Sequence, residues 1–227
     1  MRVFVFSDLH DEEVTFESLR KKYAESDAGF DLVFILGDTT NDSPKFLEEV
    51  VSSSKNCFFI PGNNEPESAI QRVLSSRGYI HCKRVSLPNG LNIVGFGKSN
   101  ITPFGTPGEL SEEEIYSQMR SLPIDSNTIL LLHVPPLGFF DEVNGPRGSQ
   151  HIGSSSVLQI IEEKKPFVVF CGHVHENEGV AMIDNTYVIK VPAAKLGKYG
   201  IAEIDDKTRK VSAGFFSLKG VNNQITQ

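Results

Sequence analysis

The chain has 227 residues, of which 39% are hydrophobic and 22% charged, a composition typical of a globular protein and not of a disordered one. Its 22 basic and 29 acidic residues give a formal net charge of −7, so no overall positive field attracts nucleic acid or an anionic membrane. Any phosphate group that this protein recognises must therefore be held by something local, such as a metal ion.

The cysteines and the start of the chain predict the compartment. Three cysteines lie far apart without a C-x-x-C pair, which indicates neither a disulfide framework nor a cysteine zinc site. The apolar start is only a few residues long before Ser7 and Asp8, too short for a signal peptide, and no segment reaches membrane-spanning length. We therefore expect a cytoplasmic protein without membrane contact.

The first half of the chain alternates buried strands with amphipathic helices. Strands are predicted at residues 2–6, 32–36 and 57–60, and helices at 11–24, 44–51 and 66–76. Val14, Leu19 and Tyr23 are expected on the apolar face of the first helix, and Ser43 and Pro44 mark the start of the second. Strand and helix repeating at this spacing predict a parallel sheet with right-handed crossovers.

The second half has a different pattern. A hairpin is predicted around residues 88–90, a helix with a capping box at 111–121, strands at 128–132 and 167–171, and, after a long loop, a helix from about 154 to 164. Four further strands, at 180–183, 186–191, 200–204 and 211–216, are spaced for an antiparallel meander. We predict an α/β fold of two mixed sheets packed face to face and covered by helices, a single domain over residues 1–218, and a polar tail at 219–227.

Side chains that can bind a metal follow five of the predicted buried strands. In chain order they are Asp8, His10, Asp38, Asn63, His133, His173 and His175. Because the carboxyl ends of strands line the ligand crevice of an α/β sheet, we expect these side chains to converge. Two carboxylates, one amide oxygen and four imidazoles suit a transition metal better than calcium or magnesium. Seven ligands are too many for one tetrahedral ion and fit two ions that share a carboxylate.

The same residues resemble a known motif set. Asp8-x-His10, Gly37-Asp38, Gly62-Asn63-x-Glu65, His133 and Gly172-His173-x-His175 are similar, in this order, to the motifs of the calcineurin-like metallophosphoesterases. Each piece alone is uninformative, whereas the ordered set, with every piece at a strand end, is specific. The resemblance implies a four-layer α/β/β/α sandwich.

The resemblance also implies a ligand assignment and a reaction. Asp8, His10 and His175 would hold a first divalent ion, Asn63, His133 and His173 a second, and Asp38 would bridge the two. The ions would be Mn²⁺, Fe²⁺, Zn²⁺ or Ni²⁺, and a hydroxide between them would attack the phosphorus of a small phosphate ester in line. Asp38 and Asn63 are accordingly expected among the catalytic residues.

The third motif departs from its commonest form, Gly-Asn-His-Asp or Gly-Asn-His-Glu. This chain has Asn64 in place of the histidine. Asn64 is expected to contact the substrate, but an amide cannot titrate, and general acid catalysis typically contributes about 10²–10⁴-fold. Since family members without that histidine are often phosphodiesterases, the resemblance implies a phosphodiesterase with weak monoesterase activity.

The loop after His133 supplies a candidate replacement. Its HxPP and HxGS pieces resemble a subset of small prokaryotic family members. His151 would act as a catalytic or substrate-binding residue, and the amides near Gly153 and Ser154 would receive an anion at the start of the next helix. Alternatively, Ser154 only caps that helix and His151 lies at the surface.

Two other functions stay open. If His151 supplies the missing acid, the protein would be a phosphomonoesterase or nucleotidase. A non-catalytic protein-binding scaffold on the same fold is disfavoured because all seven ligands are present. A nuclease is disfavoured because no basic stripe exists. Neither the substrate nor the oligomeric state is indicated.

Overall fold

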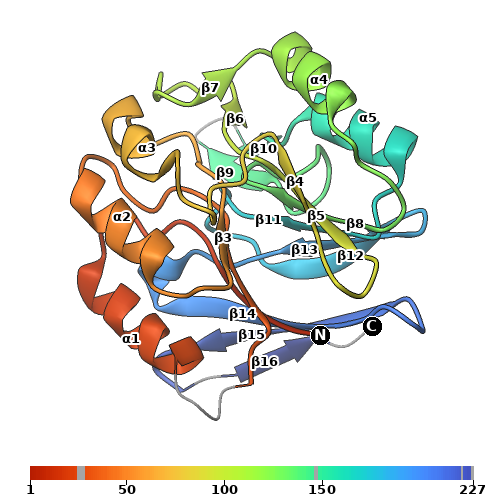
Figure 1. Cartoon of the computed structure of the whole chain (residues 1–227). Helices are drawn as coiled ribbons and strands as arrows, with labels where there is room; N and C mark the ends of the chain where they lie inside the picture. Colours follow the sequence, from red (N-terminus) through yellow and green to blue (C-terminus); the bar gives the residue numbers. More distant parts are fainter. Residues whose placement is uncertain (25–28, 146–147, 221, 226–227) are drawn as a thin grey trace.

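Two six-stranded sheets lie face to face between two layers of helices (Figure 1). The computed structural model describes residues 1–24, 29–145, 148–220 and 222–225. None of the helices in these ranges combines the length and the apolar character needed to span a bilayer.

The first sheet joins the two ends of the chain. Its order is β16-β15-β14-β1-β2-β3. β1 (Arg2–Phe6), β2 (Leu32–Ile35) and β3 (Cys57–Phe59) are parallel, whereas β14 (Lys198–Asp205), β15 (Lys210–Ser217) and β16 (Asn222–Ile225) extend the sheet in antiparallel fashion. Its outer face is covered by α1 (Glu13–Ala24), α2 (Pro44–Ser52) and α3 (Glu67–Val73) (Figure 1).

The second sheet is built from the middle of the chain, in the order β12-β13-β11-β8-β5-β4. Its strands are β4 (Lys83–Ser86), β5 (Asn92–Phe96), β8 (Thr128–Leu132), β11 (Val168–Cys171), β12 (Gly179–Ile183) and β13 (Thr186–Lys190). Its outer face is covered by α4 (Glu112–Ser121) and α5 (Ser155–Lys164). Two small additions flank it: β6 (Ser99–Asn100) pairs with β7 (Glu109–Leu110), and β9 (Glu142–Gly145) pairs with β10 (Gly148–His151).

Alternation of side chains along the strands produces the layers. In β1, Val3 and Val5 face the second sheet, while Phe4 and Phe6 face the helices, and all four are buried. The same alternation in the second sheet separates the central core from the core beneath α4 and α5. The predicted fold of two mixed sheets covered by helices is thus confirmed, with four layers in the order helix, sheet, sheet, helix.

The predicted helix starts are accurate where capping residues mark them. Ser43 accepts a hydrogen bond from the amide of Phe46 at the start of α2, and Ser111 forms the expected capping box with Glu114. The apolar face of α1 was partly wrong. Val14 is 81% exposed, and Phe16 takes the buried position, because residues 16, 19 and 23 share one helical face.

The predicted meander is also wrong, because its four strands belong to two sheets. β12 and β13 pair in the second sheet, while β14 and β15 pair in the first. Between them the chain crosses through a short 3₁₀ helix at Ala194–Leu196. Within the segment expected to be a polar tail, residues 222–225 form the edge strand β16, and 221, 226 and 227 lie outside the described residues.

Candidate metal centre

The seven predicted ligands lie beyond the carboxyl ends of five parallel strands, β1, β2, β3, β8 and β11, three from the first sheet and two from the second. Tight turns after these strands aim the side chains into the gap between the sheet ends. Four of the seven residues have a left-handed backbone, with φ of 58° at Asp8, 50° at His10, 51° at Asp38 and 73° at His173. Residues other than glycine rarely adopt this conformation, and it concentrates at functional sites.

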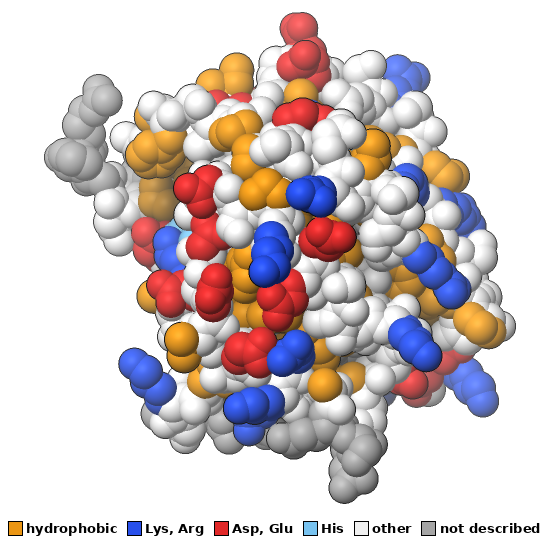
Figure 2. Space-filling view, turned by 60° about the vertical axis from the view of Figure 1, so that its left-hand side comes forward, with side chains coloured by type: hydrophobic (Ala, Val, Ile, Leu, Met, Phe, Trp, Pro, Cys, Tyr) orange, Lys and Arg blue, Asp and Glu red, His pale blue; other side chains and the backbone are white. Residues whose placement is uncertain are grey.

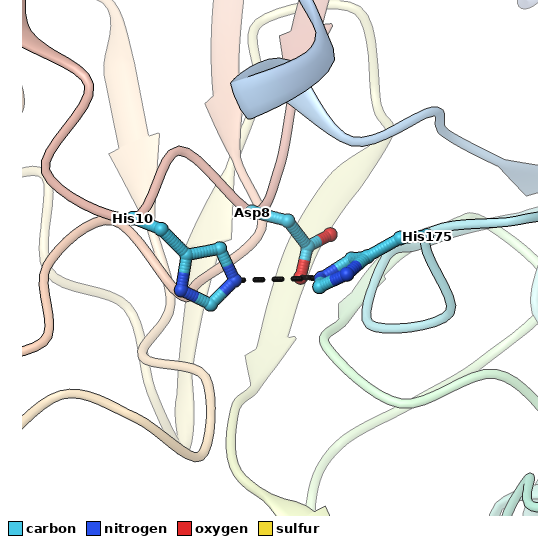
Figure 3. Close-up of side chains that lie close together, drawn as sticks. All are labelled: Asp8, His10 and His175. Atoms are coloured by element: carbon cyan, nitrogen blue, oxygen red, sulfur yellow. Dashed lines mark hydrogen bonds and ion pairs between the residues drawn. The ribbon is translucent and has the colours of Figure 1, made fainter.

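The first group consists of Asp8, His10 and His175, which point toward one another (Figure 3). His10 Nε2 lies 3.4 Å from His175 Nε2, which in turn lies 3.3 Å from Asp8 Oδ1. On the other side of its ring, His10 Nδ1 lies 3.0 Å from Asn41 Oδ1. Asn41 therefore fixes the proton on Nδ1 and leaves the His10 Nε2 lone pair directed into the group.

The second group is formed by Asp38, His133 and His173, together with Asn63. His133 Nε2 lies 3.0 Å from Asn63 Oδ1 and 3.1 Å from His173 Nδ1. His133 Nδ1 donates to the carbonyl of Leu36 at 2.7 Å, so Nε2 is the ring nitrogen that faces the group. Since Asn63 Nδ2 donates to Thr106 Oγ1 at 2.9 Å, the Asn63 oxygen is turned inward.

Asp38 lies between the two groups. One of its oxygens is 3.7 Å from His10 Nε2 in the first group, and the other is 3.5 Å from His133 Nε2 in the second. Both oxygens also accept hydrogen bonds from Asn64, whose amide nitrogen and side-chain Nδ2 lie 2.9 Å and 2.5 Å away. Asp38 is thus placed to contact an ion in either group.

The chemistry of this donor set fits two metal ions. Ring nitrogens of neighbouring histidines lie 3.1–3.4 Å apart, and Asn63 Oδ1 lies 3.0 Å from His133 Nε2, so the donor atoms of each group are close enough to share one ion. Asp8 Oδ1 is buried and accepts no hydrogen bond, and such an unpaired polar atom costs about 1–3 kcal/mol unless something else compensates it. Mixed imidazole and oxygen donors suit a divalent transition metal.

Electrostatics around the site favour positive charge. Burial tends to lower the pKa of His133, but Asp38 and Asp8 raise it to about 9. Burial opposes ionisation of Asp38, yet His133 keeps its pKa at about 2. Burial and the neighbouring His133 lower the pKa of His173 to about 4, which keeps that imidazole neutral and able to ligate.

Glu65 supports the site. From the sequence it was recognised as part of the third motif, but no role was assigned to it. Its buried carboxylate accepts hydrogen bonds from the amides of Gly62 at 2.7 Å, Thr39 at 2.5 Å and Asp38 at 3.1 Å, joining the loops after β2 and β3. Burial and the nearby Asp38 raise its pKa to about 8. The loops approach so closely that a Cβ at Gly62 would lie 2.1 Å from Asp38 Oδ1, which explains the glycine of the motif.

Lys190 is a second supporting residue that the sequence did not reveal, since it ends an otherwise apolar strand. Its side chain is fully buried, and burial lowers its pKa. Its Nζ donates to the carbonyls of Asn177, at 3.2 Å, and Val191, at 2.8 Å. It thereby holds the loop that carries His173 and His175 against β13.

A cleft of about 770 Å³ opens over both groups and is lined by Asp38, Asn63, Asn64, His173 and His175 among others. A small area of histidine surface lies in a recess at the left of Figure 2, beside hydrophobic, acidic and basic side chains. His151 lines the same cleft from β10, with 56% of its side chain exposed. Its Nδ1 lies 2.7 Å from Asp141 Oδ1, a contact that raises the pKa of His151.

At the start of α5, where an anion site was expected, the amides of Gly153 and Ser154 already have protein partners. Ser154 is fully buried and outside the cleft, accepting from the amide of Val157 and donating to Glu112 Oε2. The same carboxylate oxygen accepts from the amide of Ser156, while the amide of Gly153 donates to Asp141. Ser154 therefore caps the helix from a buried position outside the cleft lining; Gly153 lines the cleft, but its amide is already paired.

Comparison with known proteins places these features in a family. The family model described as calcineurin-like phosphoesterase matches residues 1–177. MJ1162 of Methanocaldococcus jannaschii, an uncharacterized protein, is 32% identical over 166 residues, which cover 70% of this chain and 76% of that protein. The 3′,5′-cyclic adenosine monophosphate phosphodiesterase CpdA of Escherichia coli is 30% identical over 162 residues, covering 65% of this chain and 55% of CpdA. The chain thus spans about half the length of CpdA.

Solved structures show the same fold. TT1561 of Thermus thermophilus superposes with a TM-score of 0.70 at 14% identity, covering 96% of this chain and 98% of that one. An archaeal phosphodiesterase superposes with a TM-score of 0.52, also at 14% identity, covering 95% of this chain and 100% of that one.

Proposed function

This chain belongs to the calcineurin-like phosphoesterase family, and on that premise we propose that it is a phosphodiesterase that hydrolyses small phosphate esters at a dinuclear metal centre. The observation that carries the proposal is the meeting of seven metal-capable side chains, drawn from both sheets, under one cleft. CpdA and the archaeal structural neighbour are both phosphodiesterases by name, which supports the choice of ester.

The proposed ligands are Asp8, His10 and His175 for one ion and Asn63, His133 and His173 for the other, with Asp38 shared. When bound, two divalent cations would supply an activated water and neutralise the phosphate oxygens. The chain's own contribution is to fix the ligands: Asn41 and the Leu36 carbonyl orient two imidazoles, and Thr106 turns Asn63 inward.

The preference for diesters rests on Asn64. Both of its hydrogen-bond donors are directed to Asp38, and its amide cannot transfer a proton. A leaving group then departs without acid assistance from this position, which disfavours esters of poorly acidic alcohols.

The alternative, a monoesterase or nucleotidase, is favoured by one observation. His151 faces the cleft, and its contact with Asp141 raises its pKa and so favours the protonated, proton-donating form near neutral pH. In that case His151 would take the place of the missing motif histidine as an acid.

Hydrolysis of matched aryl esters separates the two functions. With Mn²⁺, Fe²⁺, Zn²⁺ or Ni²⁺ supplied in turn, we expect kcat/KM for bis(4-nitrophenyl) phosphate to exceed that for 4-nitrophenyl phosphate by about tenfold or more. Faster hydrolysis of the monoester would favour the monoesterase or nucleotidase. Absence of hydrolysis with every metal would favour the non-catalytic protein-binding scaffold.

The variant Asn64→His extends this test. Restoring a titratable group should raise kcat for diesters with a poor leaving group, such as phenol, by about 10²-fold. The increase in kcat for 4-nitrophenyl esters should be much smaller. Asn64→Gln, which keeps an amide, is the matched control and should show no such gain.

A further inference from the structure

One wall of the cleft consists of exposed apolar side chains between β6 and β7. Ile101, Pro103 and Phe104 form this wall, which we term the apolar shelf. Ile101 is 70% exposed and Phe104 is 84% exposed, the highest value among the large hydrophobic residues in the described part of the chain. Exposed apolar surface that borders a polar site commonly marks a binding surface.

The segment that carries the apolar shelf is hydrogen-bonded to Asn63, one of the proposed ligands. The carboxylate of Glu109 accepts hydrogen bonds from the hydroxyls of Thr102 and Thr106, at 2.5 Å and 2.6 Å, and closes the shelf segment into a compact turn. The Thr106 hydroxyl also accepts from Asn63 Nδ2, and the amide of Gly108 donates to the Asn63 carbonyl at 2.9 Å. The position of the shelf is therefore fixed relative to Asn63, one of the proposed ligands.

A second part of the cleft wall is also partly apolar. Val143 and Ile152 line the cleft from the hairpin of β9 and β10 and its exit. Asn100 Nδ2 donates to the carbonyl of Ile152 at 3.2 Å and so links this wall to the start of the shelf segment. A group that extends from the metal centre along the cleft would thus have these apolar side chains available in addition to the apolar shelf.

The charges along the cleft limit what that group can be. Among the described residues that line it, none is lysine or arginine, and Asp38 and Glu176 are acidic. Apart from His151, none of the described lining residues away from the metal centre would offer a positive charge to a second anionic group. A neutral group needs no such partner and suits the apolar surface.

We infer that the apolar shelf binds a neutral, apolar or aromatic ester group of a monoanionic phosphodiester whose phosphate lies at the metal centre. The inference rests on the proposed function and narrows its substrate class. Contact with the shelf removes apolar surface of both partners from water, and covering a side chain as large as Phe104 corresponds to about a tenfold gain in affinity.

Binding of two phosphinates tests the inference without catalysis. Diphenylphosphinate and dimethylphosphinate are both monoanions, and their P–C bonds are not hydrolysed. By titration calorimetry on the Mn²⁺-loaded protein, we expect diphenylphosphinate to bind about tenfold more tightly. In Phe104→Ala this preference should fall to about threefold or less, while the affinity for dimethylphosphinate stays unchanged. Val14→Ala, which removes an equally exposed apolar side chain outside the cleft, should behave as the wild type.

Three results would overturn the inference: equal affinities of the two phosphinates in the wild type, an undiminished preference in both Phe104→Ala and Ile101→Ala, or binding of neither compound. The proposed function fails separately. If the protein prefers diphenylphosphinate but hydrolyses no diester, the inference about the apolar shelf stands and the phosphodiesterase assignment fails. If it hydrolyses diesters but shows no preference between the phosphinates, the assignment stands and the inference fails.

Discussion

The six histidines of this chain differ in their surroundings. Four meet at the metal centre, His151 lies on the hairpin beside the cleft, and His81 lies apart from both. His81 Nδ1 accepts a hydrogen bond from the amide of Gly97 at 2.9 Å, which requires an unprotonated Nδ1. Burial, helped by Lys98 and Lys83, lowers its pKa from 6.5 to about 4.

His81 should therefore make the fold sensitive to acid. Between pH 6.5 and pH 4, His81 is protonated in the unfolded chain but not in the folded one. The contribution of unprotonated His81 to the free energy of unfolding is therefore complete above pH 6.5 and is lost as the pH falls toward 4. From pH 7 to pH 5 the loss is about 2 kcal/mol. His81→Asn keeps an acceptor for Gly97 without titrating, and urea unfolding at the two pH values should show a correspondingly smaller decrease. Parallel pH profiles of variant and wild type would contradict this.

The metal-capable residues were predictable one by one because each follows a buried strand, where sequence order already implies proximity. The supporting roles of Glu65 and Lys190 could not be predicted, because they depend on burial and on backbone hydrogen-bond partners that only the folded chain supplies. The pairing of the amides near Ser154 could not be predicted for the same reason, since Gly153 donates to Asp141, Ser154 to the Pro135 carbonyl and Ser156 to Glu112 on another helix.

At the scale of elements, α5 illustrates how a helix start can resemble a binding site. Ser154→Ala removes the cap of α5 and one partner of Glu112, and we expect it to lower the free energy of unfolding by about 1 kcal/mol. Because Ser154 lies outside the cleft, kcat/KM for a diester should remain within about twofold of the wild type. Urea unfolding and a diester assay on the same preparation check both parts. Lost activity at unchanged stability would restore Ser154 to the substrate site.

Most strands and helices were predicted within a few residues because apolar runs and capping residues mark them. The hairpin of β9 and β10 was missed, since Gly148–His151 is exposed throughout and has no apolar alternation. The error over the last strands is of another kind. Local spacing correctly indicated hairpins, but which sheet each hairpin joins depends on partners far away in sequence, β1 for β14 and β11 for β13.

At the scale of the molecule, the metal centre connects two sheets. Its proposed ligands come from β1, β2 and β3 on one side and from β8 and β11 on the other. A ligand that binds only the folded state adds about 2.7 kcal/mol when present at 100 times its Kd. For a chain of this size each kcal/mol corresponds to about 2–4 °C in Tm.

We therefore expect removal of metal to lower the Tm by roughly 5–10 °C for each ion lost. Scanning calorimetry of the Mn²⁺-loaded and the chelator-treated protein measures this difference. Asp38→Asn, which keeps the shape but removes the shared charge, should show a clearly smaller effect of metal. An identical Tm with and without metal would argue against ions that tie the sheets together.

The pairing of β1 with β14 has a consequence for synthesis on the ribosome. β1 leaves the exit tunnel before the other strands of its sheet, yet one of its two neighbours is encoded almost 200 positions later. By the time His175 has been made, every proposed metal ligand exists, while one border of β1 is still an unsatisfied edge open to pairing with other nascent chains. Completion of this sheet, and protection of its edge from aggregation, must therefore wait until β14 has been made, although every proposed metal ligand precedes it in the chain.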